Sequence, residues 1–250
     1  MLVEHSLRRK RFSKKYLQKV IGKLNWCARV VSGGRTFMRN LINLMTQLKQ
    51  PHHHSRLNAA AKADLRWWVT GLEFFHGHTP FTSDIALPSH QFSTDACLIG
   101  GGAMFRGDWF YVSWVNDIPE VQNCHINVLE LETVLIAAER WGHLWSGSHI
   151  LVRSDNTTTV AAINKGSSRS VELLLIIQKL FWLSVEHGFK LSASYLPGTM
   201  NVLSDRISRL HDPMAAVEAK ELLTDVMVME ASSHMTFKTF LYLQECWGTS

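Results

Sequence analysis

Apolar and polar positions follow two different patterns along the chain, and the pattern changes near residue 90. Before that point, apolar side chains recur at the three- and four-residue spacing of amphipathic helices, which predicts helices over 13–28, 35–50 and 58–75. We expect Asn58 to act as the N-cap of the third helix. After residue 90, short apolar runs are separated by turns, as is typical of β-strands. The chain therefore joins a helical region to a region that contains a sheet.

The second region predicts a sheet covered by helices. Strands are expected over 91–96, 101–105, 109–114, 149–153 and 191–195. Helices are expected over 127–145, 157–164, 171–187 and 202–210. This order, β-β-β-α-β-α-α-β-α, predicts an α/β fold with a mixed five-stranded sheet and flanking helices, preceded by a small helical region. Residues 213–250 are expected to form a helical tail of unknown role.

Charge is distributed unevenly between the two regions. The 250 residues carry a net charge of +5, but residues 1–90 hold 15 basic and 4 acidic side chains while residues 91–250 hold 11 and 17. This split favours a polyanion, such as nucleic acid, as the partner of the first region. The densest run of basic residues in the first region is Arg8, Arg9, Lys10 and Arg11. The alternative to nucleic-acid binding is that this run is a solvated tail or resembles a nuclear-import signal.

Several classes of protein are excluded by the composition. The longest apolar stretch, around 173–182, contains Gln178 and Lys179 and is too short and polar for a membrane span. No apolar run follows the basic N-terminus, so we expect no cleaved secretion signal. The four cysteines lack CxxC spacing, which argues against a zinc ribbon or a disulfide framework. We expect an intracellular protein, cytoplasmic or nuclear, of undetermined oligomeric state.

Four acidic residues stand in contexts that would point them at a common site, and three of them lie where strands end or helices begin. Asp95 lies in the first expected strand, Glu130 in the first turn of the long helix, Asp155 after the strand over 149–153, and Asp205 near the start of the last helix. Carboxylates that converge on one point repel each other unless cations neutralise them. The set therefore indicates Mg²⁺ or Mn²⁺ and phosphate chemistry. The alternative is that these acids are helix caps and surface charges.

Helix geometry selects between the two glutamates of the long helix. Glu130 and Glu132 are separated by about 200° around the helix axis, so only one can face the sheet. Glu130 shares its stripe with Val134, Ala137 and Trp141. We therefore expect Glu130 to point inward and Glu132 to face water.

Four motifs carry a resemblance to a known family. In chain order they are Ser93-Thr94-Asp95-Ala96 with Gly102-Ala103, Asn127-Val128-Leu129-Glu130-Leu131, Ser154-Asp155-Asn156, and Leu196-Pro197-Gly198 with Asn201-Val202-Leu203-Ser204-Asp205-Arg206. Together they resemble the ribonuclease H domain that follows reverse transcriptase in retroelements, over about residues 88–212. A looser similarity, carried by Gly22-Lys23-Leu24-Asn25-Trp26 and Gly33-Gly34-Arg35-Thr36-Phe37, relates residues 1–86 to the thumb and connection region of DIRS-like retrotransposons.

The resemblance implies a ribonuclease H fold and hydrolysis of the RNA strand of an RNA–DNA hybrid with two Mg²⁺ ions, Mn²⁺ being a substitute. Asp95 would bridge both ions, Asp205 would help to hold the ion that activates water, and Glu130 and Asp155 would hold the ion at the leaving oxygen. Contacts with the RNA 2′-hydroxyl groups would come from Asn127, Asn156 and the backbone near residues 97–100.

Two departures from the family pattern affect the expected activity. The stretch 195–205 has no histidine, a residue the family often places before its last aspartate, and Cys97 stands where the family commonly has serine or glycine. The domain also lacks the basic protrusion with which the cellular enzymes hold their substrate, and Lys165 and Arg169 are the cations between Asp155 and the helix expected over 171–187. The basic segment over 1–75 would then have to hold the hybrid.

The function expected from these features is a Mg²⁺-dependent endonuclease within a retrotransposon reverse transcriptase polyprotein. No Tyr-x-Asp-Asp motif occurs, so polymerase activity is not expected. The alternative is a catalytically inactive nucleic-acid-binding remnant of the same fold. The two differ in whether the four carboxylates lie within about 5 Å of one another.

Overall fold

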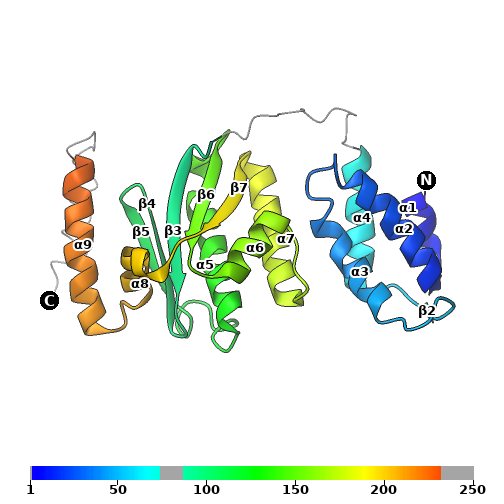
Figure 1. Ribbon diagram of the computed structural model, residues 1–250, viewed down its shortest axis with the longest axis horizontal. Coiled ribbons are helices and arrows are strands. Elements are labelled where there is room, and N and C mark those ends of the chain that lie inside the picture. Colours follow the sequence, from blue (N-terminus) through cyan, green and yellow to red (C-terminus); the bar gives the residue numbers. More distant parts are fainter. Residues whose placement is uncertain (1, 74–86, 232–250) are drawn as a thin grey trace. The chain divides into compact units, whose positions relative to one another are not determined.

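The structure is a computed structural model that describes residues 2–73 and 87–231 (Figure 1). The chain divides into two compact units. The first comprises Met1–Ser89, Ala138–Ile150 and Thr158–Ala193, and the second His90–Ala137, Leu151–Thr157 and Ser194–Ser250. The division into 1–86, 88–212 and 213–250 stays a prediction. No helix in the described ranges combines the length and the apolar character that a membrane crossing requires.

Short helices form the N-terminal region. They are α1 (Leu2–Arg8), α2 (Lys14–Cys27), the 3₁₀ turn η1 (Thr36–Met38), α3 (Arg39–Thr46) and α4 (Ala59–Glu73), with the small strands β1 (Phe12–Ser13) and β2 (His54–Ser55) between them. Their apolar faces bury Leu17, Leu41, Leu65 and Trp68 almost completely, which gives this region its own core. The side chain of Asn58 accepts a hydrogen bond from the N–H of Ala61 at 2.8 Å, which confirms the expected cap.

The helix expected over 35–50 differs from the observed structure. Phe37 has non-helical angles (φ −93°, ψ 33°), which separate the turn η1 from α3, and α3 ends at Thr46. The sequence pattern also missed α1. The differences within 35–50 lie at helix ends, where the apolar spacing carries little information. The helix α1 has only seven residues, which is too short for a clear apolar repeat.

Five strands form the main sheet. They are β3 (His90–Ala96), β4 (Gly100–Phe105), β5 (Asp108–Ser113), β6 (His149–Ser154) and β7 (Lys190–Tyr195). The order is β5-β4-β3-β6-β7, so β3 is the central strand. β3 pairs antiparallel with β4, and β4 with β5. The expected turn between β4 and β5 has positive φ at Arg106 (50°) and Gly107 (76°), as a two-residue hairpin turn requires.

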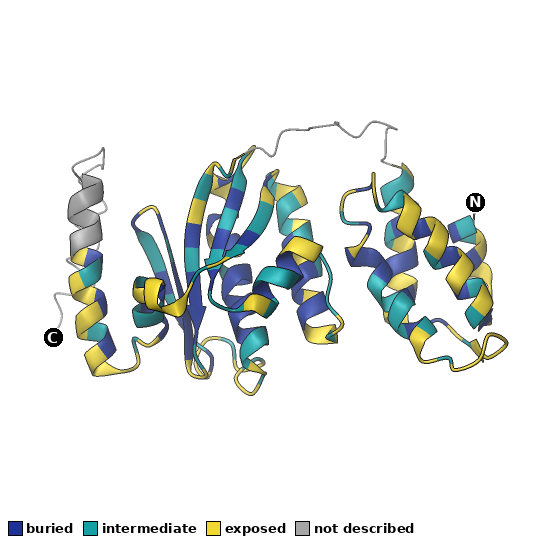
Figure 2. Ribbon diagram, viewed as in Figure 1, coloured by how far each residue is buried: buried dark blue, intermediate teal, exposed yellow. Residues whose placement is uncertain are grey.

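Helices flank this sheet. They are α5 (Ile126–Trp141), α6 (Thr157–Lys165), α7 (Val171–His187), α8 (Val202–Ser208) and α9 (Pro213–Ala231), with the 3₁₀ turns η2 (Gly142–Leu144) and η3 (Gly198–Met200). Figure 2 shows that buried residues make up most of β4 and most of α5. Leu129, Leu135 and Ile150 are almost fully buried and belong to the core. The predicted element order and α/β class are confirmed.

Polar contacts and close packing fix α8 against β3 and β4. Ser93 and Ser204 share a hydrogen bond at 2.6 Å, and the side-chain amide of Asn201 donates to the carbonyl of Thr94 at 2.9 Å. A Cβ atom at Gly102 would lie 2.4 Å from Ile207 Cγ2, so the approach of α8 to β4 requires glycine there. These contacts place Asp205 beside the end of the central strand.

Candidate active site

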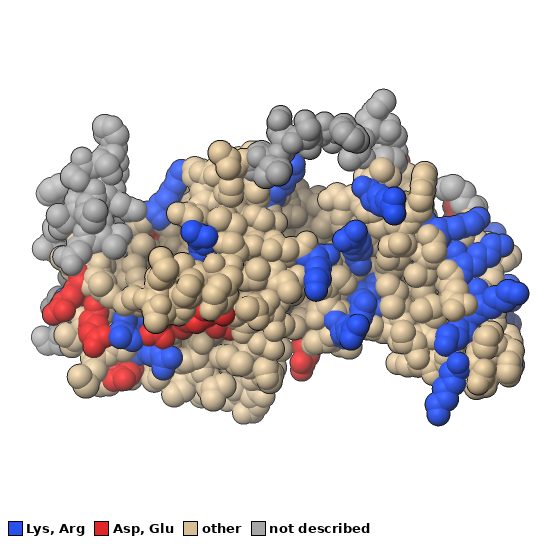
Figure 3. All heavy atoms as spheres, in the orientation of Figure 1, with Lys and Arg blue, Asp and Glu red and all other residues tan. Residues whose placement is uncertain are grey.

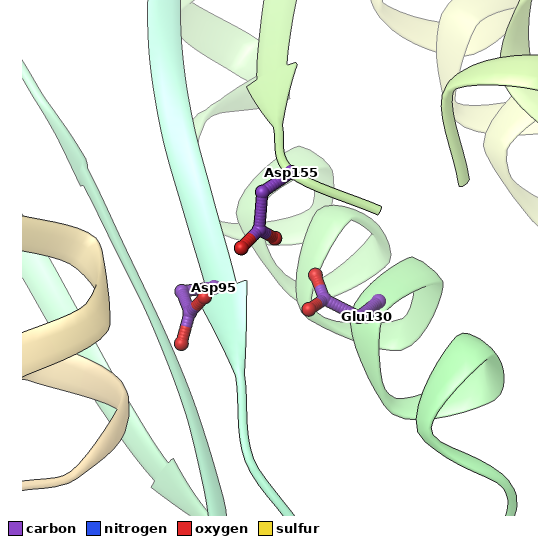
Figure 4. A group of neighbouring side chains, drawn as sticks. All are labelled: Asp95, Glu130 and Asp155. Carbon is purple, nitrogen blue, oxygen red and sulfur yellow. The ribbon is translucent and has the colours of Figure 1, made fainter. Parts of the chain in front are cut away.

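Three of the predicted acids converge on one point. Asp95 is the penultimate residue of β3, Asp155 follows the last residue of β6, and Glu130 lies in the second turn of α5. Each offers a carboxylate oxygen, and these three oxygens all lie within 4.8 Å of one another (Figure 4). In that view β6 runs in the same direction as β3, so the sheet is mixed, as predicted. We call these residues the carboxylate cluster.

Asp95 is the most constrained member of the cluster. It is 5% exposed, and burial raises its pKa to about 6, against the hydrogen bond from Ser208 that lowers it. The negative charges of Asp155 and Asp205 are smaller causes of the same rise in the pKa of Asp95. The Ser208 hydroxyl donates to Asp95 Oδ2 at 2.5 Å and fixes the orientation of the carboxylate.

Glu130 lies in the driest environment of the cluster. It is 4% exposed, and burial, followed by the charges of Asp95 and Asp155, raises its pKa to about 9. A hydrogen bond from the backbone N–H of Ala96 opposes this shift. Its Oε2 atom is buried and has no hydrogen-bond partner. A buried acceptor without a partner destabilises a fold unless something else binds it.

The cluster fits a divalent cation. Carboxylate oxygens are the ligands that Mg²⁺ and Mn²⁺ prefer, and a cation would neutralise the repulsion that raises the pKa values of Asp95 and Glu130. It would also bind the free Oε2 atom of Glu130. These three residues can therefore hold a metal ion.

The first residue of η3 lies close to Asp155. A Cβ atom at Gly198 would lie 3.0 Å from Asp155 Oδ2, tighter than most contacts of real Cβ atoms. Glycine at this position lets the backbone approach the half-buried aspartate. The Leu196-Pro197-Gly198 motif thus contributes to the shape of the site.

Asp205 is not a member of the carboxylate cluster. It lies in α8, its side chain is 26% exposed, and it is near enough for its charge to raise the pKa of Asp95. Its oxygens pair with arginines instead: Oδ1 accepts from Arg209 Nε at 2.9 Å and Oδ2 from Arg206 Nη1 at 2.6 Å. The structure therefore brings three of the four predicted carboxylates together and leaves the fourth in ion pairs.

Of the two expectations for the glutamates of α5, one is confirmed and one is wrong. Glu130 points into the cluster as predicted, but the expectation that Glu132 faces water is wrong, because Glu132 is only 9% exposed. Neighbouring elements cover α5 on nearly every side between residues 128 and 138. The polar face of such a helix does not identify a solvent-facing side.

The two predicted asparagines contact each other. The side-chain amide of Asn156 donates to Asn127 Oδ1 at 2.8 Å, and both residues are half-buried. Asn156 follows Asp155 directly, so the pair borders the carboxylate cluster. Their contact with RNA stays a prediction.

The basic run at the N-terminus lines a cavity. Pairing of β1 with β2 sets Phe12 opposite Ser55, so Arg11 and Arg56 flank the same ladder. The cavity has a volume of ≈ 960 Å³. It is lined by Leu7, Arg8, Arg9, Lys10, Arg11, Arg56, Leu57 and Lys62. All six basic residues are exposed, and no acidic residue is among the described residues that line the cavity. Figure 3 shows Lys and Arg side chains gathered on the N-terminal helices.

The sequence patterns missed the residues that support the carboxylates. Asn201, Ser204 and Ser208 are at most 2% exposed and face β3 from α8 and the residue before it. The spacing of these residues, three and then four positions, could have identified them, because it places small polar groups on one helix face. A buried polar face on a short helix indicates hydrogen bonds to a neighbouring element.

Comparison with known proteins yields structural similarity only. No family model matches the chain, and no curated protein matches it. Among solved structures, the N-terminal RNase H domain of rv2228c from Mycobacterium tuberculosis, solved as a fusion with maltose binding protein, is 14% identical with a TM-score of 0.38, over 52% of this chain and 99% of that chain. The protease-reverse transcriptase of prototype foamy virus is 14% identical with a TM-score of 0.29, over 74% of this chain and 25% of that chain. The chain thus spans about a quarter of the foamy virus protein, and the DIRS assignment stays a prediction.

Proposed function

We propose that this protein is a Mg²⁺-dependent ribonuclease H that hydrolyses the RNA strand of RNA–DNA hybrids, as part of a retrotransposon reverse transcriptase polyprotein. The observation that carries the proposal is the carboxylate cluster, whose oxygens lie within 4.8 Å of one another in a buried site. Two cations, when bound, would stabilise the attacking and leaving oxygens of a phosphodiester displacement. The sequence motifs select ribonuclease H among the reactions that such a site supports.

Each acid has a distinct place in this proposal. Asp95 lies on the central strand and is oriented by Ser208, so it is the rigid ligand suited to bridge two ions. Glu130 and Asp155 would hold the ion at the leaving oxygen. Asp205 would help to hold the ion that activates water if its contacts with Arg206 and Arg209 were exchanged for that ion.

The basic cavity is the proposed binding site for the nucleic acid. Six exposed basic side chains surround a space of ≈ 960 Å³, and like charges this close repel one another unless an anion neutralises them. Arg9 is held by its contact with the Tyr16 ring, 4.5 Å from the ring centroid, and by donation from Nε to the carbonyl of Arg11 at 2.8 Å. Such an array suits the sugar–phosphate backbone, while Asn127 and Asn156 would contact the 2′-hydroxyl groups of RNA.

A cleavage assay on hybrids tests the proposal. Purified protein with Mg²⁺ should cut the RNA of a labelled RNA–DNA hybrid, and Asp95→Asn should reduce the rate by at least about 100-fold while hybrid binding persists. Asp117→Asn is the matched control, because it removes the same charge from an exposed turn where its oxygen accepts from the N–H of Ser113.

Each result of the assay has a clear reading. Binding without cleavage in wild type would indicate the inactive nucleic-acid-binding remnant. Equal cleavage by wild type and Asp95→Asn would refute the assignment of the site.

A further inference from the structure

Asp205 differs from the other three acids in that its own helix neutralises it. Arg209, one turn further along, donates from Nε to Oδ1 at 2.9 Å, and Arg206 donates from Nη1 to Oδ2 at 2.6 Å. Both oxygens are therefore engaged. Among the described residues, no ion pair joins a basic side chain to the carboxylate cluster, and Glu130 Oε2 has no hydrogen-bond partner.

Arg206 is fixed from a second side by the C-terminal helix. It forms an ion pair with Glu218 of α9, and α9 buries Ala215, Ala219 and Leu223 along one face at a spacing of four residues. The tail helix thus supports the arginine that engages Asp205. This contact gives residues 213–224 a link to the site.

We propose that Arg206 and Arg209 are positioning residues that set the order in which cations bind. The first ion enters the carboxylate cluster, and the second binds only when it displaces an arginine from Asp205. The two arginines thus keep Asp205 from binding a cation until the second ion displaces one of them. This inference rests on the proposed function, because it takes Asp205 as a ligand of the second ion.

The size of the effect follows from the exposure of the ion pair. The side chains of Arg209 and Asp205 are 49% and 26% exposed, so the pair is partly screened by water. Ion pairs of this kind change an equilibrium by about 1.5- to 5-fold. Loss of one arginine should therefore tighten the second binding step by about that factor.

Titration with Mn²⁺ tests the order directly. The full chain is titrated without nucleic acid, the bound ions are counted by electron paramagnetic resonance, and the two dissociation constants are measured by calorimetry. Arg209→Gln should lower the second constant relative to the first by about 2- to 5-fold. Arg206→Gln should act in the same direction and serves if Arg209→Gln does not fold. A wild type that takes up one ion, with a variant that takes up two, would also support the proposal.

The control removes the same charge from another place near the site. Arg153 lies two residues before Asp155 and donates to Ser194 at 2.8 Å, so Arg153→Gln should leave the ratio of the two constants unchanged. An unchanged ratio in both Arg206→Gln and Arg209→Gln would overturn the proposal, as would an equal change in Arg153→Gln.

Failure of this inference is distinguishable from failure of the proposed function. Asp205→Asn should abolish the second step, and if that step survives, Asp205 is not its ligand and the inference falls. A wild type that binds no Mn²⁺ and cuts no hybrid would instead refute the proposed function.

Discussion

Glu130 should make the stability of the metal-free protein depend on pH. Its pKa rises from an ordinary 4.5 to about 9 in the folded protein. Between these values the folded protein holds a proton on Glu130 that the unfolded chain has lost. Because the folded state binds more protons, its stability falls as pH rises through this window and no further above about pH 9.

The magnitude follows from the linkage of one proton. Each pH unit inside the window lowers the free energy of unfolding by about 1.4 kcal/mol, so the step from pH 6.5 to 8.0 lowers it by about 2 kcal/mol. Asp95, with a pKa of about 6, contributes mainly below this interval. Glutamine at position 130 has no proton to release, so Glu130→Gln should remove the slope.

Guanidinium chloride unfolding in EDTA, followed by tryptophan fluorescence, provides the measurement. The quantity is the difference in unfolding free energy between Glu130→Gln and wild type at pH 6.5 and 8.0, in which the contributions of the 13 histidines cancel. Glu186→Gln, an exposed glutamate of α7, is the matched control and should show no pH-dependent difference. Saturating Mg²⁺ should flatten the wild-type slope, because a bound cation keeps Glu130 ionised. A difference that stays constant with pH would refute the assignment of a proton to Glu130.

Two further predictions concern packing and charge. Gly102→Ala should destabilise the protein by about 1–3 kcal/mol, because its Cβ atom would meet Ile207 at 2.4 Å. Gly22→Ala is the control, because a Cβ atom there would have nothing within 4 Å. Equal midpoints of thermal unfolding for the two glycine variants would contradict the packing argument. Lys62→Gln should weaken hybrid binding and reduce the slope of log affinity against log salt concentration by about one. Lys19→Gln, which changes an exposed lysine outside the basic cavity, should leave both the affinity and the slope unchanged. Identical salt slopes for the two lysine variants would show that only the net charge matters.

The sequence predicted the sheet and three of the four acids well because these depend on local patterns. The alternation in β6 and the four-residue spacing in α7 come from the faces that each element buries. The position of Asp205 could not be predicted in the same way. Its side chain is paired with the arginines at 206 and 209, and whether a carboxylate joins a cluster or pairs with nearby arginines depends on distances that spacing does not contain. Glu132 was misjudged for a related reason, since the coverage of α5 comes from neighbouring elements.

The hydrogen bonds that hold α8 against β3 have a consequence for synthesis of the chain. Ser93 with Ser204, Thr94 with Asn201, and Asp95 with Ser208 join positions that are 111, 107 and 113 residues apart. Contacts this distant close late, because the intervening chain must first be ordered. During translation Asp95 emerges long before the helix that orients it. We therefore expect a nascent chain to hold most of its sheet before Ser208 orients Asp95, so that the carboxylate cluster takes its final geometry only after residue 208 has left the ribosome.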